Sequence, residues 1–165
     1  MNVVTGLGKV VGAELVRNPD VDKISFTGSV AIGEGIMRDG AATMKRITLE
    51  LGGKSPTVLL DDAPLDEAIP AALTMAFLNS GQACAAGTRL LVPKSKLNSV
   101  KTAIQETMKS FSVGDPADPK IAVGPMVSQN QYDRVQSYIR KGIEEGPRCW
   151  LVARAIRKVS KRATS

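Results

Sequence analysis

The sequence of 165 residues contains no histidine and only two cysteines, Cys84 and Cys149. Without histidine the chain can form no Ser-His-Asp triad, no Cys-His pair and no His-ligated metal site. Any general base must therefore be a carboxylate, a lysine or a tyrosine. Two cysteines are too few for a zinc site or a disulfide framework. These absences exclude histidine-dependent catalysis and predict that the chain binds no metal.

Long apolar runs are also missing. No stretch approaches the ~20 residues that a membrane span requires, and residues 1–8 lack the basic start and apolar centre of a signal peptide. At 43% hydrophobic and 23% charged residues, the composition is that of an ordinary globular protein. We therefore expect a folded protein of the reducing cytoplasm with no membrane partner.

Acidic residues are missing from the last part of the chain. The net charge is +6, yet residues 1–146 hold 16 basic and 16 acidic side chains, whereas residues 147–165 hold 6 basic ones and no acidic one. A basic excess can indicate a nucleic-acid partner. This tail has no amphipathic stripe, and Trp150 is its only aromatic residue. We predict no nucleic-acid partner and interpret the tail as an unselected charged terminus.

The body of the chain alternates short apolar runs with segments of helical periodicity, which predicts an α/β fold. Strands are expected at residues 23–27, 45–50, 55–60 and 88–92. Helices are expected at residues 30–44, from about residue 66 to residue 80, from about residue 97 to residue 111, and from residue 128 to residue 146. A strand-helix unit of about thirty residues fits a parallel crossover. Gly52 and Gly53 indicate a domain boundary.

Three helices have a predicted buried face. These faces carry Ile69, Leu73 and Phe77; Leu97, Val100, Ile104, Met108 and Phe111; and Tyr132, Val135, Ile139 and Ile143. The last helix opens on Ser128 with Gln131 three positions later, which is typical of a capping box.

Cys84 is a candidate nucleophile because residues 81–87 (GQACAAG) surround it with small side chains. Small neighbours leave room for a substrate and allow backbone N–H groups to face the sulfur, where they favour the thiolate and can hold an oxyanion. The alternative is a small buried cysteine in the core, which for a lone cysteine is the commoner situation.

Glu50 is a candidate general base. It ends an expected strand, and α/β proteins bind ligands at the carboxyl ends of their strands. A partly buried carboxylate there suits general-base chemistry. The alternative is a structural ion pair with Lys45, Arg46 or Lys54.

Residues 28–33 (GSVAIG) join an expected strand to an expected helix. The first helical N–H groups and the Ser29 hydroxyl can hold a phosphate, while Gly33 allows the helix to pack closely on the sheet. The spacing does not match Gly-x-Gly-x-x-Gly, and a plain tight turn is the alternative. The earlier glycines, Gly6, Gly8 and Gly12, are interpreted as a loop leading into a helix that packs on the sheet.

Three segments occur together in a specific order: residues 25–29 (SFTGS) with Gly33, residues 49–56 (LELGGKSP), and residues 81–84 (GQAC) with Arg89. In this combination the chain closely resembles the aldehyde dehydrogenase superfamily over residues 1–146, including Gly124 and Pro125. The match corresponds to the middle portion of a complete member.

The resemblance implies a fold and a domain organisation. Residues 1–53 would form the end of a Rossmann-like, parallel-sheet cofactor domain, and residues 54–146 the first part of an α/β catalytic domain. Residues 147–165 would follow as a disordered tail.

The resemblance also implies a mechanism that needs no histidine. In this family a cysteine thiolate attacks an aldehyde, a hydride passes to the nicotinamide of NAD or NADP, and water hydrolyses the resulting thioester to a carboxylic acid. Cys84 matches the nucleophile and Glu50 the carboxylate that activates the water. Gly28, Ser29, Gly33 and Leu51 match the cofactor-binding positions.

Several family parts have no counterpart in this sequence. The oxyanion-binding asparagine and a ribose-binding lysine would precede residue 1, and the Glu-x-Phe-Gly-Pro segment and a subunit-pairing strand would follow residue 165. We therefore expect a truncated fragment that is inactive alone, and the alternative is a non-catalytic remnant or subunit-interaction fragment. Complete members are oligomers, and exposed sheet edges would lead the fragment to self-associate.

The basic tail has a second interpretation in the genetic code. When its codons are regrouped from the third base, residues 149–155 are compatible with the Leu-Val-Gly-Gly segment that commonly follows this helix in the family. Residues 162–165 are compatible with Gly-Tyr-Phe in the same shifted frame. We therefore hypothesise a frameshift near Pro147.

Overall fold

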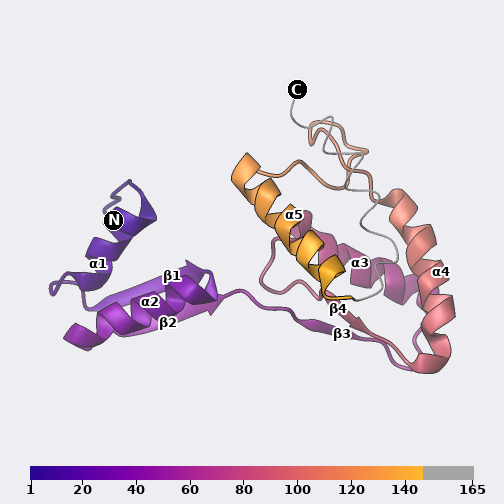
Figure 1. The fold of residues 1–165 in the computed structure, drawn as a ribbon, viewed down its shortest axis with the longest axis horizontal. Coiled ribbons are helices and arrows are strands. Elements are labelled where there is room, and N and C mark those ends of the chain that lie inside the picture. Colours follow the sequence, from indigo (N-terminus) through magenta and orange to yellow (C-terminus); the bar gives the residue numbers. More distant parts are fainter. Residues whose placement is uncertain (147–165) are drawn as a thin grey trace. The chain divides into compact units, whose positions relative to one another are not determined.

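A computed structural model describes residues 1–146, so the hypothesis of a frameshifted, disordered tail concerns residues outside the described part of the chain. The chain divides into two compact units, Met1–Lys54 and a second unit that begins at Ser55. Each unit contains a two-stranded parallel sheet together with helices (Figure 1). The predicted α/β fold with parallel strands is therefore confirmed.

The first unit is a strand-helix-strand arrangement preceded by a short helical segment. Its elements are η1 (Gly8–Gly12), α1 (Ala13–Arg17), β1 (Lys23–Gly28), α2 (Val30–Gly40), η2 (Ala41–Thr43) and β2 (Arg46–Leu51). β1 pairs in parallel with β2, with Lys23 opposite Arg46 and Thr27 opposite Glu50. Both strands form where the sequence predicts them.

The two faces of the β1–β2 sheet differ in polarity because side chains alternate along a strand. Ile24, Phe26, Ile47, Leu49 and Leu51 are partly buried, and α2 covers Leu49 and Leu51. The opposite face carries the exposed side chains of Ser25, Thr27, Thr48 and Glu50. One face of this sheet is thus part of the core and the other is polar.

Helix α2 ends at Gly40, earlier than the expected end at residue 44. A 3₁₀ turn follows, and Met44 takes a left-handed conformation with φ of 53°. Lys45 then starts the return into β2, and its ammonium donates to the carbonyl oxygens of Asn18 at 2.6 Å and Val21 at 2.5 Å. The chain must reverse here to pair β2 beside β1, so tertiary contacts terminate the helix before its apolar periodicity does.

The second unit also contains two parallel strands, and two of its helices are longer than any helix of the first unit. Its elements are β3 (Pro56–Val58), α3 (Leu65–Gly81), β4 (Arg89–Leu91), η3 (Lys94–Lys96), α4 (Leu97–Thr107), η4 (Met108–Ser110) and α5 (Gln129–Glu144). Thr57 of β3 lies opposite Leu90 of β4. Both strands are shorter than predicted, although the Leu59 N–H still donates to the Leu91 carbonyl oxygen at 2.9 Å.

The core of the second unit lies where α3 and α4 meet the segment after β3. It is formed by Leu59, Ile69, Leu73 and Val100, and Ile69 is 0% exposed. The predicted buried faces of α3 and α4 are confirmed apart from Leu97. That side chain is 41% exposed because it occupies the first position of α4, beyond the edge of the core.

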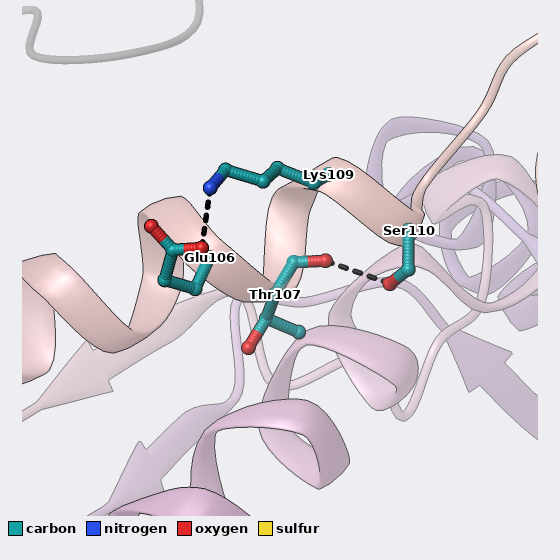
Figure 2. Close-up of polar contacts among 4 residues, drawn as sticks. All are labelled: Glu106, Thr107, Lys109 and Ser110. Atoms are coloured by element: carbon teal, nitrogen blue, oxygen red, sulfur yellow. Dashed lines mark hydrogen bonds and ion pairs between the residues drawn. The ribbon is translucent and has the colours of Figure 1, made fainter.

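Local hydrogen bonds define the ends of the later helices. Figure 2 shows the end of α4, where the Ser110 hydroxyl donates to the Thr107 carbonyl oxygen at 2.7 Å and Lys109 pairs with Glu106. At the start of α5 the Ser128 hydroxyl accepts the N–H of Gln131 at 3.3 Å. The predicted cap at Ser128 is confirmed.

The apolar stripe of α5 is only partly covered. Its residues Tyr132, Val135 and Ile139 are half-buried, whereas Ile143 is exposed, contrary to the prediction. The helix ends before Gly146, whose φ is +88°. Among residues 1–146, none of the helices has the length and apolar character needed to cross a bilayer.

Candidate functional site

The turn between β1 and α2 presents hydrogen-bond donors that the helix does not use. Ser29 is the N-cap of α2 in an extended conformation, and its carbonyl oxygen accepts the Gly33 N–H at 3.0 Å. Its exposed side chain makes no capping hydrogen bond. The first N–H groups of an α-helix have no carbonyl partner within the helix. The turn therefore has the donor set that an anion requires.

Gly33 brings α2 close to the sheet. A Cβ at this position would lie 2.9 Å from Leu51 Cδ2 and 3.4 Å from Leu49 Cδ1. The predicted close packing at Gly33 is therefore confirmed. The Leu51 side chain lies under α2, on the face of the sheet opposite to Glu50, so Leu51 offers a ligand only its backbone.

An open cavity of about 800 Å³ lies within the first unit, and its lining includes residues of η1, α1, β1 and α2. The sequence interpretation missed it by treating the first glycines as a simple loop and helix. The small residues around it recur with a spacing of four: Gly8 and Gly12 on one side, and Ala31 and Gly35 on α2. This spacing was the signal available in the sequence, since small residues one turn apart leave a groove on a helix.

Glu50 lies on the polar face of the β1–β2 sheet, near the carboxyl end of β2 and opposite Thr27. The side chain is exposed, so the partial burial that would suit it to general-base chemistry is not found in this chain. Its neighbours on this face are Ser25 and Thr48 rather than apolar groups. The ammonium of Lys45 is held by the carbonyl oxygens of Asn18 and Val21, which argues against Lys45 as an ion-pair partner.

Cys84 lies in the segment between α3 and β4, and its thiol is free and exposed. The Ala86 N–H donates to the Ala83 carbonyl oxygen at 3.1 Å, which closes a tight turn with Cys84 at its second position. The alternative of a buried core cysteine is therefore wrong. A thiol on a tight turn is accessible to a substrate.

The segment before this turn has an unusual backbone. Regular helix geometry stops before Leu78, and Asn79, Ser80 and Gly81 all have positive φ values of 52°, 58° and 74°. The Asn79 carbonyl oxygen accepts the Gln82 N–H at 3.1 Å, and the Asn79 amide donates to the Gln82 carbonyl oxygen at 3.5 Å. These residues end α3 and redirect the chain toward Cys84.

The candidate residues are divided between the two units. Ser29, Gly33 and Glu50 belong to the first unit, whereas Cys84 belongs to the second. Within the first unit, Glu50 lies opposite Thr27. Within the second unit, the Cys84 turn is followed by Gly87, whose carbonyl oxygen accepts the Thr57 hydroxyl.

Comparisons with known proteins agree on one family. The family model described as "Aldehyde dehydrogenase family" matches residues 1–162. The chain is 45% identical over 145 residues to a 3-succinoylsemialdehyde-pyridine dehydrogenase from a Pseudomonas species, an alignment that covers 88% of this chain and 30% of the relative.

Solved structures give the same result for the fold. Aldehyde dehydrogenase C from Pseudomonas syringae, solved in complex with NAD+ and octanal, matches with a TM-score of 0.83 and 42% identity, over 87% of this chain and 30% of that one. An NADP-dependent enzyme from E. coli matches with a TM-score of 0.83 and 39% identity, over 89% and 31% respectively. The chain thus spans about 30% of the length of these relatives.

Proposed function

Because the chain belongs to the aldehyde dehydrogenase family, we propose that it carries the nucleophile and the general base for NAD(P)-dependent oxidation of an aldehyde to a carboxylic acid. The observation that carries this proposal is the exposed Cys84 thiol on its tight turn, within a chain that matches the family over residues 1–162. The activity of a complete enzyme, its aldehyde substrate and its cytoplasmic setting are parts of the proposal.

Cys84 is the proposed nucleophile. Its thiolate adds to the carbonyl carbon of the aldehyde, and the thiol proton passes to solvent. The product is a thiohemiacetal whose carbon still carries the aldehyde hydrogen. The exposure of the thiol supports this role, because a substrate can reach the sulfur without displacing core residues.

The first unit is the proposed cofactor site. NAD+ or NADP+ held there would supply the acceptor for the hydride that leaves the thiohemiacetal carbon, and Cys84 would then carry a thioester. The Ser29 hydroxyl and the first N–H groups of α2 would hold a phosphate, and Gly33 and Leu51 would set the position of α2. The cavity lined by η1, α1, β1 and α2 has room for an apolar ring of the cofactor. Relatives solved with NAD+ and a relative described as NADP-dependent support this assignment without choosing between the two cofactors.

Glu50 is the proposed base for the last step. Its carboxylate takes a proton from water as the water oxygen attacks the thioester carbon. The C–S bond then breaks, the carboxylic acid leaves and the Cys84 thiolate is restored. The place of Glu50 near the carboxyl end of β2, on the polar face of the β1–β2 sheet, supports this role.

The roles of Cys84 in forming the acyl-enzyme and of Glu50 in hydrolysing it can be tested separately with p-nitrophenyl acetate. This ester transfers its acetyl group to a thiol without any cofactor, and mass spectrometry identifies the acetylated residue. Cys84→Ser should reduce acetylation by about 10³-fold or more, whereas Cys149→Ser should leave it unchanged. Glu50→Gln should slow the subsequent hydrolysis by about 10²-fold or more, with Glu34→Gln as the matched exposed control. Acetylation that does not depend on Cys84 would contradict the proposal.

We expect the isolated chain not to sustain NADH or NADPH formation with a panel of aldehydes. The relatives in which this fold is found are about three times as long. Robust turnover by the purified chain would overturn this part of the proposal.

A second candidate function is subunit interaction without catalysis. Val58, Leu60 and Leu91 are exposed on and beside the β3–β4 sheet, and such apolar surface favours association. This candidate predicts co-purification with a full-length family member and self-association in sedimentation experiments. A chain that sediments as a monomer and binds no family member would exclude it.

A further inference from the structure

We propose that Thr57 is a positioning residue for Cys84, acting through a hydrogen bond to the backbone of Gly87. The inference rests on the proposed function, because it concerns how the nucleophile is held. Thr57 lies in β3, 27 residues before Cys84 and outside the segment that contains the cysteine.

The contact between Thr57 and Gly87 is direct. The half-buried Thr57 hydroxyl donates to the Gly87 carbonyl oxygen, with a distance of 3.3 Å between the two oxygen atoms. A Cβ at position 87 would lie 2.0 Å from Thr57 Oγ1, so this approach of backbone to hydroxyl is possible only with glycine. The pair therefore anchors the backbone at Gly87 to the centre of β3.

The anchor lies at the end of the turn that carries Cys84. Ala86 closes the turn through its N–H and is 3% exposed, and Gly87 follows it and is also buried. The Thr88 N–H donates to the Ala86 carbonyl oxygen at 2.9 Å, which directs the chain into β4. The sequence thus passes from an exposed thiol to a buried, hydrogen-bonded backbone within three residues.

This arrangement has a chemical consequence. The turn 83–86 has one hydrogen bond of its own, so its orientation depends on how its two ends are held. Asn79 and Gln82 hold the first end, and the second end is held by Thr57 and, two residues beyond Gly87, by the Arg89 N–H, which donates to the Ser55 carbonyl oxygen at 3.3 Å. A fixed turn keeps the sulfur in one position, which reduces the entropy lost on reaction, and in general N–H groups held so that they face a sulfur favour the thiolate. Loss of the Thr57 hydroxyl should loosen the second end and lower the reactivity of the thiol.

The test uses the full chain in a Cys149→Ser background, so that Cys84 is the only thiol. The rate of alkylation by iodoacetamide is measured over a pH series. Thr57→Val removes the hydroxyl and keeps the branched shape, and Thr57→Ser keeps the hydroxyl. Thr102→Val is the matched control, because the Thr102 hydroxyl also donates to a backbone carbonyl oxygen, that of Asn98 at 3.2 Å, on exposed helix surface.

Thr57→Val should lower the rate at neutral pH by about 5-fold, the size expected for one neutral hydrogen bond, and move the midpoint of the pH profile upward. Thr57→Ser should restore both quantities, and Thr102→Val should change neither. If Thr57 contributed only to general stability, Thr57→Val would lower the melting temperature but leave the midpoint of the pH profile unchanged. Thr57→Ala removes the hydroxyl without adding a methyl group, and it replaces Thr57→Val if that variant does not fold.

The proposal is overturned if the variants lacking the hydroxyl share the pH profile of the parent chain, or if Thr57→Ser behaves like Thr57→Val. Failure of the proposed function looks different. In that case p-nitrophenyl acetate does not acetylate Cys84 in the parent chain, while the shift of the alkylation profile on loss of the Thr57 hydroxyl is still observed.

Discussion

The two units position their candidate residues by different means. In the first unit, Ser29 and Glu50 lie at a helix start and near a strand end, where the regular elements β1, α2 and β2 determine their positions. In the second unit, Cys84 lies in an irregular segment that depends on three residues of positive φ and on a contact with β3. Regular secondary structure therefore positions Ser29 and Glu50, whereas the position of Cys84 depends on an irregular backbone and one long-range hydrogen bond.

This difference also separates two kinds of chemical task. A phosphate site needs several weak donors, and a helix start supplies them as a group. A nucleophile needs one atom in one place, and a small displacement of that atom is costly. Of the three non-glycine residues with positive φ among residues 1–146, Asn79 and Ser80 directly precede the Cys84 turn, and the third, Met44, lies in the first unit.

The largest effect on stability is expected at Gly87. Gly87→Ala places a methyl group 2.0 Å from Thr57 Oγ1, so either the Thr57 side chain must rotate and lose its hydrogen bond to Gly87, or the backbone must move. We expect a loss of about 1–3 kcal/mol in the free energy of unfolding, as for overpacking of a core, measured by urea denaturation.

The matched control is Gly142→Ala in α5, where a Cβ would meet no atom within 4 Å. This change should be neutral or stabilising by up to about 1 kcal/mol, because alanine favours the helix. Equal effects of the two substitutions would show that the Gly87 contact is not tight in solution, and the contrast between the units would lose its main support.

The sequence predicted the features that follow from local patterns. The buried face of α3 and the cap at Ser128 depend on neighbouring residues, and the parallel pairing of β1 with β2 depends on a standard crossover. Periodicity and capping chemistry are sufficient for such features.

The features that the sequence did not predict depend on contacts between distant residues. The contact of Gly87 with Thr57 joins positions 30 residues apart. The early end of α2 depends on Lys45 reaching Asn18 and Val21. The motifs therefore indicated which residues matter, but the environment of each residue required the fold.

A second prediction compares the helix caps of the two units. Ser128 caps α5 through its hydroxyl, whereas the Ser29 side chain makes no such bond at the start of α2. Ser128→Ala should therefore cost about 1 kcal/mol of stability, and Ser29→Ala should cost much less. Thermal unfolding of the two variants measures this difference.

Ser29→Ala should instead weaken cofactor binding. Loss of one hydrogen bond to a charged phosphate should lower the affinity for NAD+ or NADP+ by about 10-fold, measured by calorimetric titration of the full chain. Ser128→Ala should leave that affinity unchanged. If Ser29→Ala destabilises the protein as much as Ser128→Ala does, the hydroxyl acts as an ordinary cap and the phosphate assignment loses its basis.

The smallest effect is expected at Ser80, and it has the opposite sign. Ser80 has a φ of 58°, a conformation that costs a non-glycine residue free energy and costs glycine almost none. Ser80→Gly should therefore stabilise the second unit by about 0.5 kcal/mol, after the greater entropy of glycine in the unfolded chain is subtracted. Ser137→Gly in the middle of α5 should destabilise it by about 0.5–1 kcal/mol, since glycine disfavours a regular helix. Opposite shifts of the urea midpoint would establish that the left-handed segment before Cys84 exists in solution, whereas equal losses would mean that it does not.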